Sequence, residues 1–200
     1  MDKLVWVLSV YLVPLGIALI SIAAIFAWDN QYDFGNATPL KLHVLPAAAK
    51  SLTAEQARDQ LAGTRGVNHF DTNRSEIPVW FTFDPGSSVA PGSYIEFPSR
   101  HATRVSCWDR ASLAPLGEAS RSGVQGMLAM AKAGFSLRLD QAAAPVLCRA
   151  QFVGPARLSA EIWSAEEMQQ STQQFHRNSG LLDGGLIVLA VFVLMTAWIN

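Results

Sequence analysis

The sequence predicts a mainly β fold, a jelly-roll-like β-sandwich flanked by two transmembrane helices. Two uncharged apolar runs stand near the ends of the 200-residue chain. Between them, short segments alternate apolar and polar residues and are separated by turn signals, as in a sandwich or jelly roll. The formal net charge is −1, so no excess of lysine and arginine favours nucleic acid as a partner.

The first apolar run, Leu4–Trp28, contains no charged residue and exceeds the roughly 20 residues that a helix needs to cross a bilayer. We assign residues 1–28 to an N-terminal transmembrane anchor, and Lys3 favours a cytoplasmic N-terminus. A cleaved signal peptide is the alternative, because small residues such as Ala24 and Ala27 stand near the end of the run. The apolar core of a signal peptide is usually shorter, so we favour the anchor.

The second apolar run, Gly184–Ile199, is also uncharged. We assign residues 181–200 to a second transmembrane helix, which is short for a full span. We expect the sequence to stop inside this helix; a natural short tail anchor is the alternative. A capping-box pattern, Ser164-Ala-Glu-Glu167, predicts a polar juxtamembrane helix over residues 164–180.

The residues between the spans, 29–163, are expected to form one extracytoplasmic domain. Its first part, Asp29–Lys50, contains prolines and is expected to be irregular. A second capping-box pattern begins at Thr53 and predicts a short helix through about Leu61.

Several later segments have the composition or the alternation of strands. They are Val79–Phe83, Ser93–Phe97, Arg104–Trp108, Phe135–Leu139, Pro145–Val153 and Leu158–Trp163. Their apolar faces define an expected core, formed by Val79, Phe81, Ile95, Phe97, Leu137, Leu139, Phe152 and Ile162.

The chain has two cysteines, Cys107 and Cys148, and neither belongs to a CxxC pair. The sequence therefore gives no sign of a zinc site or a thioredoxin-like motif. Both cysteines lie on expected strands of a domain placed in an oxidising compartment, where paired cysteines tend to be bridged. We predict a disulfide between them if the two strands are neighbours or face each other; two separate buried thiols are the alternative.

The order of several segments resembles a known family. The segments are TAEQARDQL, NHFDTNRSEIPVWFTF, SYIEFPSRHATRVSCWDR, FSLRLDQAAAPVLCRAQFVGPARLSAEIWSAEEM and GLLDGGLIVLAVFVL. From Leu52 to Asn200 the chain resembles the type-2 extracellular domain of bacterial seven-transmembrane receptors with diverse intracellular signalling modules. The resemblance implies a jelly roll reminiscent of carbohydrate-binding modules, and a cytoplasmic output such as a diguanylate cyclase (GGDEF) or histidine kinase domain. A relative with only two spans framing a sensor domain is the alternative arrangement.

The candidate ligand-binding residues are Arg100, Arg104 and Trp108. Guanidinium groups and an aromatic face suit an anion or a sugar. His101 and Arg110 extend the same basic stretch. A solvated loop and strand face is the alternative interpretation.

No catalytic motif is visible in the sequence. The histidines are scattered and lack the spacing of metal ligands. A GxSxG elbow, a glycine-rich phosphate loop and a paired-carboxylate motif are also missing. We therefore expect no enzymatic activity, no metal and no cofactor within these residues.

These observations favour the ligand-sensing region of a signalling receptor in the bacterial inner membrane, with its central domain in the periplasm. The expected partners are the membrane, a small-molecule or carbohydrate ligand, and a second copy of the chain. A non-catalytic, membrane-anchored envelope protein that binds a protein partner is the alternative.

Overall fold

A computed structural model describes residues 11–12, 15–22, 37–45, 52–73, 76–86, 89–140 and 144–199, with side chains as far as Leu194. The chain divides into two compact units. One unit, Asn36–Arg177, contains the β-sheets; the other contains the two ends, Met1–Gly35 and Asn178–Asn200. The first unit is mainly β, as the sequence predicts.

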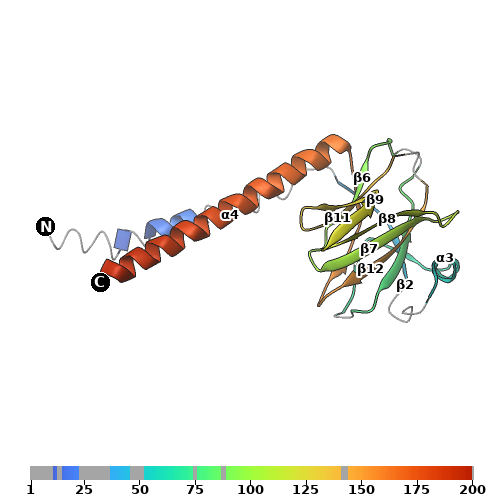
Figure 1. Cartoon of the computed structure of the whole chain (residues 1–200), viewed down its shortest axis with the longest axis horizontal. Coiled ribbons are helices and arrows are strands. Elements are labelled where there is room, and N and C mark those ends of the chain that lie inside the picture. The colour runs from blue at the N-terminus through green and yellow to red at the C-terminus, as the bar shows by residue number, and fades with distance from the viewer. Residues whose placement is uncertain are drawn as a thin grey trace. The chain divides into compact units, whose positions relative to one another are not determined.

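The larger sheet of this unit has seven strands, all paired antiparallel (Figure 1). β12 is its central strand. In spatial order the strands are β3 (Gly66–Val67), β2 (Leu42–Leu45), β5 (Val79–Phe83), β12 (Val146–Phe152), β7 (Ala102–Asp109), β8 (Pro115–Ser120) and β9 (Gly123–Gly126).

The second sheet has five antiparallel strands. In spatial order they are β1 (Thr38–Pro39), β14 (Glu161–Trp163), β6 (Tyr94–Phe97), β11 (Gly134–Arg138) and β10 (Leu128–Ala131). A small third sheet pairs β13 (Arg157–Leu158) with β4 (Phe70–Asp71).

The hydrophobic core lies between the two larger sheets. Phe81 on β5 and Phe97 on β6 pack edge to face, with ring centroids 5.7 Å apart. All but one of the expected core side chains are buried, and the exception, Ile162, is partly buried against the same cluster. This confirms the period-two assignment of the core face.

The two cysteines lie inside this core and are directly opposite each other on β7 and β12. A disulfide joins Cys107 to Cys148, whose α-carbons are 4.2 Å apart. The strand order, which the sequence left open, thus makes the two cysteine strands neighbours.

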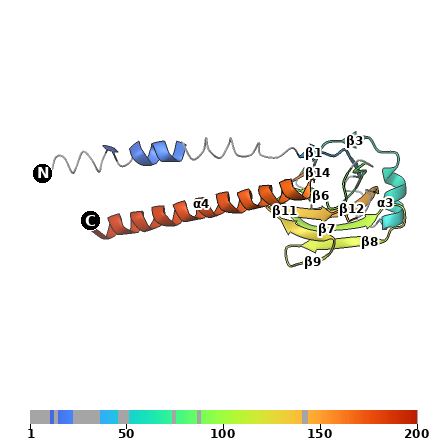
Figure 2. The same cartoon turned by 90° about the horizontal axis from the view of Figure 1, so that it is seen from above.

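One helix, α3 (Ala54–Leu61), covers part of the outer face of the seven-stranded sheet (Figure 2). The predicted capping box at Thr53 is present. Ala57 and Leu61 are buried against Trp80 and Leu147 of the sheet. Because of this cover, β5 is buried on both of its faces.

The expectation of an irregular segment over Asp29–Lys50 was wrong for residues 37–45, the part of it that the structure describes. β1 and β2 lie there, and Leu40, Leu42 and Val44 alternate into the core. Pro39 is tolerated because β1 is an edge strand, where a missing N–H leaves no ladder bond unmade. The expected single strand over Leu158–Trp163 is also divided, into β13 and β14 of different sheets.

Sequence reasoning also missed β8, β9 and β10. The chain passes from the seven-stranded sheet to the five-stranded sheet between β9 and β10. Gly126 has φ 71° at this crossing, a backbone conformation that favours glycine. A Cβ at Gly126 would also collide with the carbonyl oxygen of Leu116, so two strands approach closely there.

The last strand is followed at once by α4 (Ala165–Ile199), one continuous helix. The predicted capping box is present, because the Glu167 N–H donates to Ser164 Oγ at 3.2 Å and the Ser164 N–H donates back to Glu167 Oε2. α4 thus includes both the expected juxtamembrane helix and most of the expected second span.

In the described part of the chain, one helical stretch, Ala165–Leu194, is long enough to cross a membrane and contains an 18-residue window with a mean hydropathy of 1.5. For the expected first span, residues 15–22 are described and helical. The rest of that span lies mostly outside the described residues.

Candidate functional site

The outer face of the seven-stranded sheet carries two of the three predicted ligand residues. Arg104 and Trp108 point outward from β7, as does Ser106 between them, because Val105 and Cys107 point into the core. Arg104 is exposed, whereas Trp108 is half-buried. The alternation of β7 therefore places these two residues on one surface.

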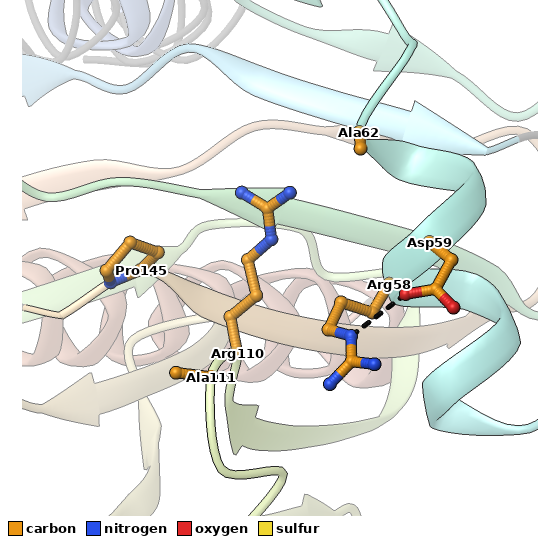
Figure 3. A pocket seen from close by; sticks show the side chains of 6 residues that line it. All are labelled: Arg58, Asp59, Ala62, Arg110, Ala111 and Pro145. Carbon is orange, nitrogen blue, oxygen red and sulfur yellow. Dashed lines mark hydrogen bonds and ion pairs between the residues drawn. The ribbon is translucent and has the colours of Figure 1, made fainter.

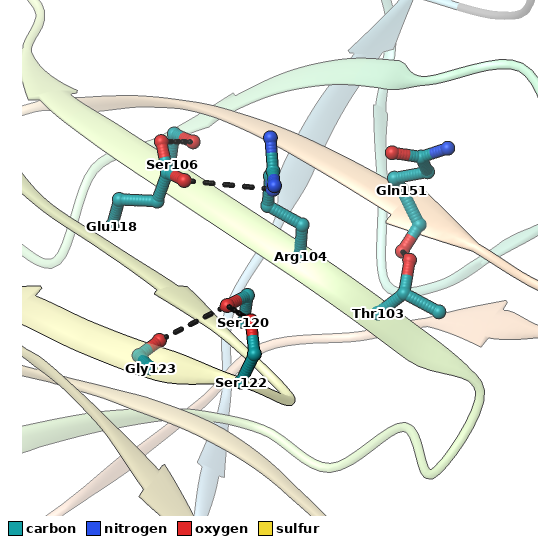
Figure 4. Close-up of polar contacts among 8 residues, drawn as sticks. All are labelled: Thr103, Arg104, Ser106, Glu118, Ser120, Ser122, Gly123 and Gln151. Carbon is teal, nitrogen blue, oxygen red and sulfur yellow. Dashed lines mark hydrogen bonds and ion pairs between the residues drawn. The ribbon is translucent and has the colours of Figure 1, made fainter.

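Arg104 belongs to a polar patch of β7 and β8 (Figure 4). Its Nε lies 3.5 Å from Glu118 Oε1, and Ser106 Oγ donates to Glu118 Oε2 at 3.1 Å. The Glu118 carboxylate therefore contacts both Ser106 and Arg104 and neutralises the charge of Arg104. An exposed pair of this kind contributes little to stability.

Trp108 packs against a buried aromatic residue rather than standing free. Its ring lies 5.5 Å from that of Trp80, which is 2% exposed. The guanidinium of Arg149, on β12 between the strands of these two tryptophans, lies 5.7 Å from the Trp80 ring, and its buried Nε has no hydrogen-bond partner among the described residues. Trp108 therefore has a structural role in addition to any contact with a ligand.

Arg100 does not share this surface. It is exposed in the turn that precedes β7, and its carbonyl oxygen accepts a hydrogen bond from Arg121 Nη2 at 2.7 Å. The structure therefore brings Arg104 and Trp108 onto one face of the sheet, whereas Arg100 lies outside that face, in the turn before β7. Arg149, which sequence reasoning missed, is detectable from the alternation of β12, because its neighbour Cys148 points into the core.

A pocket of about 340 Å³ opens where α3 meets the sheet (Figure 3). Such a volume suits a small ligand. The walls come from α3, from the turn after β7 and from the residue before β12. They are lined by Arg58, Asp59, Ala62, Arg110, Ala111 and Pro145.

The turn that carries Arg110 is fixed by its own hydrogen bonds. Asp109 Oδ1 accepts from both the N–H and the hydroxyl of Ser112, at 2.7 and 2.6 Å. These bonds hold the pKa of Asp109 below its usual value. The Arg110 N–H donates to the Pro145 carbonyl at 3.0 Å, which ties the turn to the start of β12. The carboxylate of Asp109 is therefore ionised but directed at Ser112.

A second group of charges is buried on the outer face of the five-stranded sheet. Glu96 is 1% exposed and accepts a hydrogen bond from Lys132 Nζ at 2.8 Å. Lys132 also lies over the ring of Trp163, 4.1 Å from its centroid. Glu161 is directly opposite Glu96 across the β14–β6 pair. Burial, and then the charge of Glu96, raises the pKa of Glu161.

This charged group lies beneath the start of α4. Met168, in the second turn of the helix, is 6% exposed and packs in one cluster with Trp163. Tyr94 joins the same cluster. The beginning of α4 is therefore held on the sheet by apolar contacts that directly adjoin the Glu96–Lys132 pair.

Comparisons with known proteins add no identification. No family model, no curated protein and no solved structure matches this chain. Among the described residues, no group of three or more histidine, cysteine, aspartate or glutamate side chains is arranged to hold a metal ion. Function must therefore be inferred from the surfaces described above.

Proposed function

We propose that this chain is the ligand-sensing region of a bacterial membrane signalling receptor. In this proposal the β-domain is a jelly roll in the periplasm, and the segments at residues 1–28 and 181–200 cross the inner membrane. The domain controls a cytoplasmic output, a diguanylate cyclase or a kinase, that lies beyond this sequence. The domain itself recognises and does not catalyse.

The observation that carries the proposal is the direct connection between the sheet and α4. Trp163 ends the last strand, Ser164 caps the helix, and Met168 packs back against Trp163. From there α4 continues without a break into the apolar stretch that ends at Ile199. A purely passive anchor needs no rigid joint, since a flexible linker would hold a domain at a membrane equally well.

A ligand acts on such a joint only through its differential affinity for two states of the domain. The outer face of the seven-stranded sheet, with its pocket, is the proposed ligand surface. The joint at Met168 is the proposed element that differs between the two states. A displacement of Met168 relative to Trp163 would change the position or rotation of the whole helix.

The test is a chimera in which a diguanylate cyclase domain follows Asn200, with residues inserted between Arg177 and Asn178. One inserted residue rotates the rest of the helix by about 100°, whereas seven add about two full turns. We expect one or two inserted residues to change cyclase activity strongly and seven to restore it. Activity that is independent of the insertion, with normal membrane insertion, would contradict signalling through α4.

One observation favours the alternative of a membrane-anchored envelope protein that binds a protein partner. Val124 on β9 and Met130 on β10 are 51% and 56% exposed, and each strand is the last of its sheet. Exposed apolar residues at open strand edges are typical of protein contacts. Under this alternative, V124S/M130S abolishes a cross-link to the partner, and helix insertions have no effect.

A further inference from the structure

The pocket beside α3 has an excess of positive charge. Arg58 and Arg110 face it, and Asp59 is the one carboxylate among its lining residues. Arg58 Nε lies 3.1 Å from Asp59 Oδ1, so this carboxylate already has a partner. In the described part of the chain, the side chain of Arg110 has neither an ion pair nor a hydrogen bond.

The nearest acid in sequence does not neutralise Arg110. Asp109 directs its carboxylate at Ser112 through two hydrogen bonds, and these same bonds keep it ionised. The guanidinium of Arg110 is therefore available to a ligand in the pocket. Figure 3 shows it extending between Pro145 and Ala62, with Arg58 on the neighbouring helix.

Both walls of the pocket are held in place without a ligand. Ala57 and Leu61 fix α3 on the sheet, where they are 0% and 1% exposed. The turn is fixed at the backbone, because the Arg110 N–H donates to Pro145 and the Leu113 N–H donates to the Asp109 carbonyl at 2.9 Å. A site held in this way loses little conformational freedom on binding.

From these observations we propose that the pocket binds a small carboxylate ligand, with Arg110 as its principal anchor and Arg58 as a second donor. A guanidinium presents parallel N–H donors that match the two oxygens of a carboxylate. Ala62, Ala111 and Pro145 give the lining apolar groups that suit the carbon skeleton of the ligand. An acidic sugar and an aliphatic organic acid share this chemistry. The inference rests on the proposed sensor function and names the ligand class of its surface.

The experiment uses the full chain in lipid nanodiscs and three probes, D-glucuronate, succinate and D-glucose. Binding is measured by saturation-transfer NMR with titration into the millimolar range. We expect at least one of the two acids to bind and glucose to bind much more weakly. Glucuronate alone would identify an acidic sugar, and succinate alone an organic acid. Failure of both acids, or equal binding of glucose, would overturn the proposal.

Substitutions then assign the binding to the pocket. Arg110→Gln should weaken acid binding by about tenfold or more, because a charge-assisted bidentate contact is lost. Ala62→Leu changes an exposed position directly after α3 and should block the pocket sterically without reducing the melting temperature. Arg138→Gln is the matched control, because Arg138 is an exposed arginine paired with Asp140 on the other sheet. Wild-type affinity in both pocket variants would contradict the proposal.

These outcomes are separable from the test of the proposed function. The helix-insertion chimera measures transmission through α4 and needs no ligand. If the chimera responds to insertion while the acids fail to bind, the sensor proposal stands and the ligand class is wrong. If the acids bind through Arg110 while insertions have no effect, the proposed carboxylate site is supported and the proposal of signalling through α4 is wrong.

Discussion

Removing the disulfide between Cys107 and Cys148 is expected to lower the free energy of unfolding of the domain by about 4 kcal/mol. The two cysteines are separated by 41 residues in sequence. For a loop of that size, the chain-entropy model gives about 13 cal/mol/K, or about 4 kcal/mol at 25 °C. Since domains are usually stable by about 5–15 kcal/mol, this one bond supplies a large share.

The assay is urea unfolding of the compact unit Asn36–Arg177, compared in its oxidised form, its reduced form and as C107A/C148A. The reduced form keeps both sulfur atoms in the core, so its difference from the oxidised form isolates the cross-link. The alanine variant also leaves cavities at two positions that are 0% exposed, so it should be less stable than the reduced form. The reduced form should also have the larger denaturant dependence, because its unfolded chain is less compact.

Two results would refute this reasoning. One is a difference below about 0.5 kcal/mol between the oxidised and reduced forms, which is the range of ordinary surface changes. The other is mass spectrometry that finds two alkylatable thiols in the exported protein. A large difference would in turn favour folding in an oxidising compartment, since cytosolic thiols are kept reduced.

Three further predictions follow from burial, charge and topology. Phe152→Ala should destabilise the domain by roughly 3–5 kcal/mol in urea unfolding because the ring is in the core, whereas the exposed control Val153→Ala should change stability by less than about 0.5 kcal/mol. The pKa of Glu161 is raised above its usual value of 4.5 in the folded domain. The folded domain therefore binds this proton more readily than the unfolded chain, and the free energy of unfolding should rise as the pH falls toward 4.5. Glu161→Gln should remove that slope and stabilise the domain at neutral pH by about 0.5 kcal/mol; an unchanged pH profile would contradict this. Reporter fusions should be cytoplasmic at Met1 and exported near Thr172, and an exported Met1 reporter would contradict the topology.

The central strands were predictable because they satisfy two signals at once. The runs of β5 and β12 combine β-branched or aromatic residues with alternation into the core, and their bounds agree with prediction within about a residue. β8, β9 and β10 give neither signal. Their residues, Pro115–Ala131, are rich in glycine, alanine and polar side chains, and much of their surface is exposed. Their pairing is decided by tertiary contacts and by the crossing at Gly126.

The candidate site was predictable only where it lies on one strand. Arg104 and Trp108 share a face of β7 because they are four residues apart, and alternation alone places them there. The pocket joins Arg58 to Arg110, which are distant in sequence and meet only because α3 packs against Trp80 and Leu147. No pattern in a single sequence contains that contact.

The proposed ligand surface and the start of α4 lie on different sheets, so a signal between them has to cross the core. α4 follows β14 of the five-stranded sheet, whereas the pocket adjoins β7 and β12 of the seven-stranded sheet. The ring contact between Phe81 and Phe97 spans the two sheets. A close-packed core of this kind changes between discrete packings and does not deform continuously. Phe97→Leu should therefore alter cyclase output of the chimera while leaving acid affinity at the pocket within about twofold of wild type. Equal loss of affinity and output would instead indicate that the substitution unfolds the domain, and unchanged output in a folded variant would exclude this contact from the path.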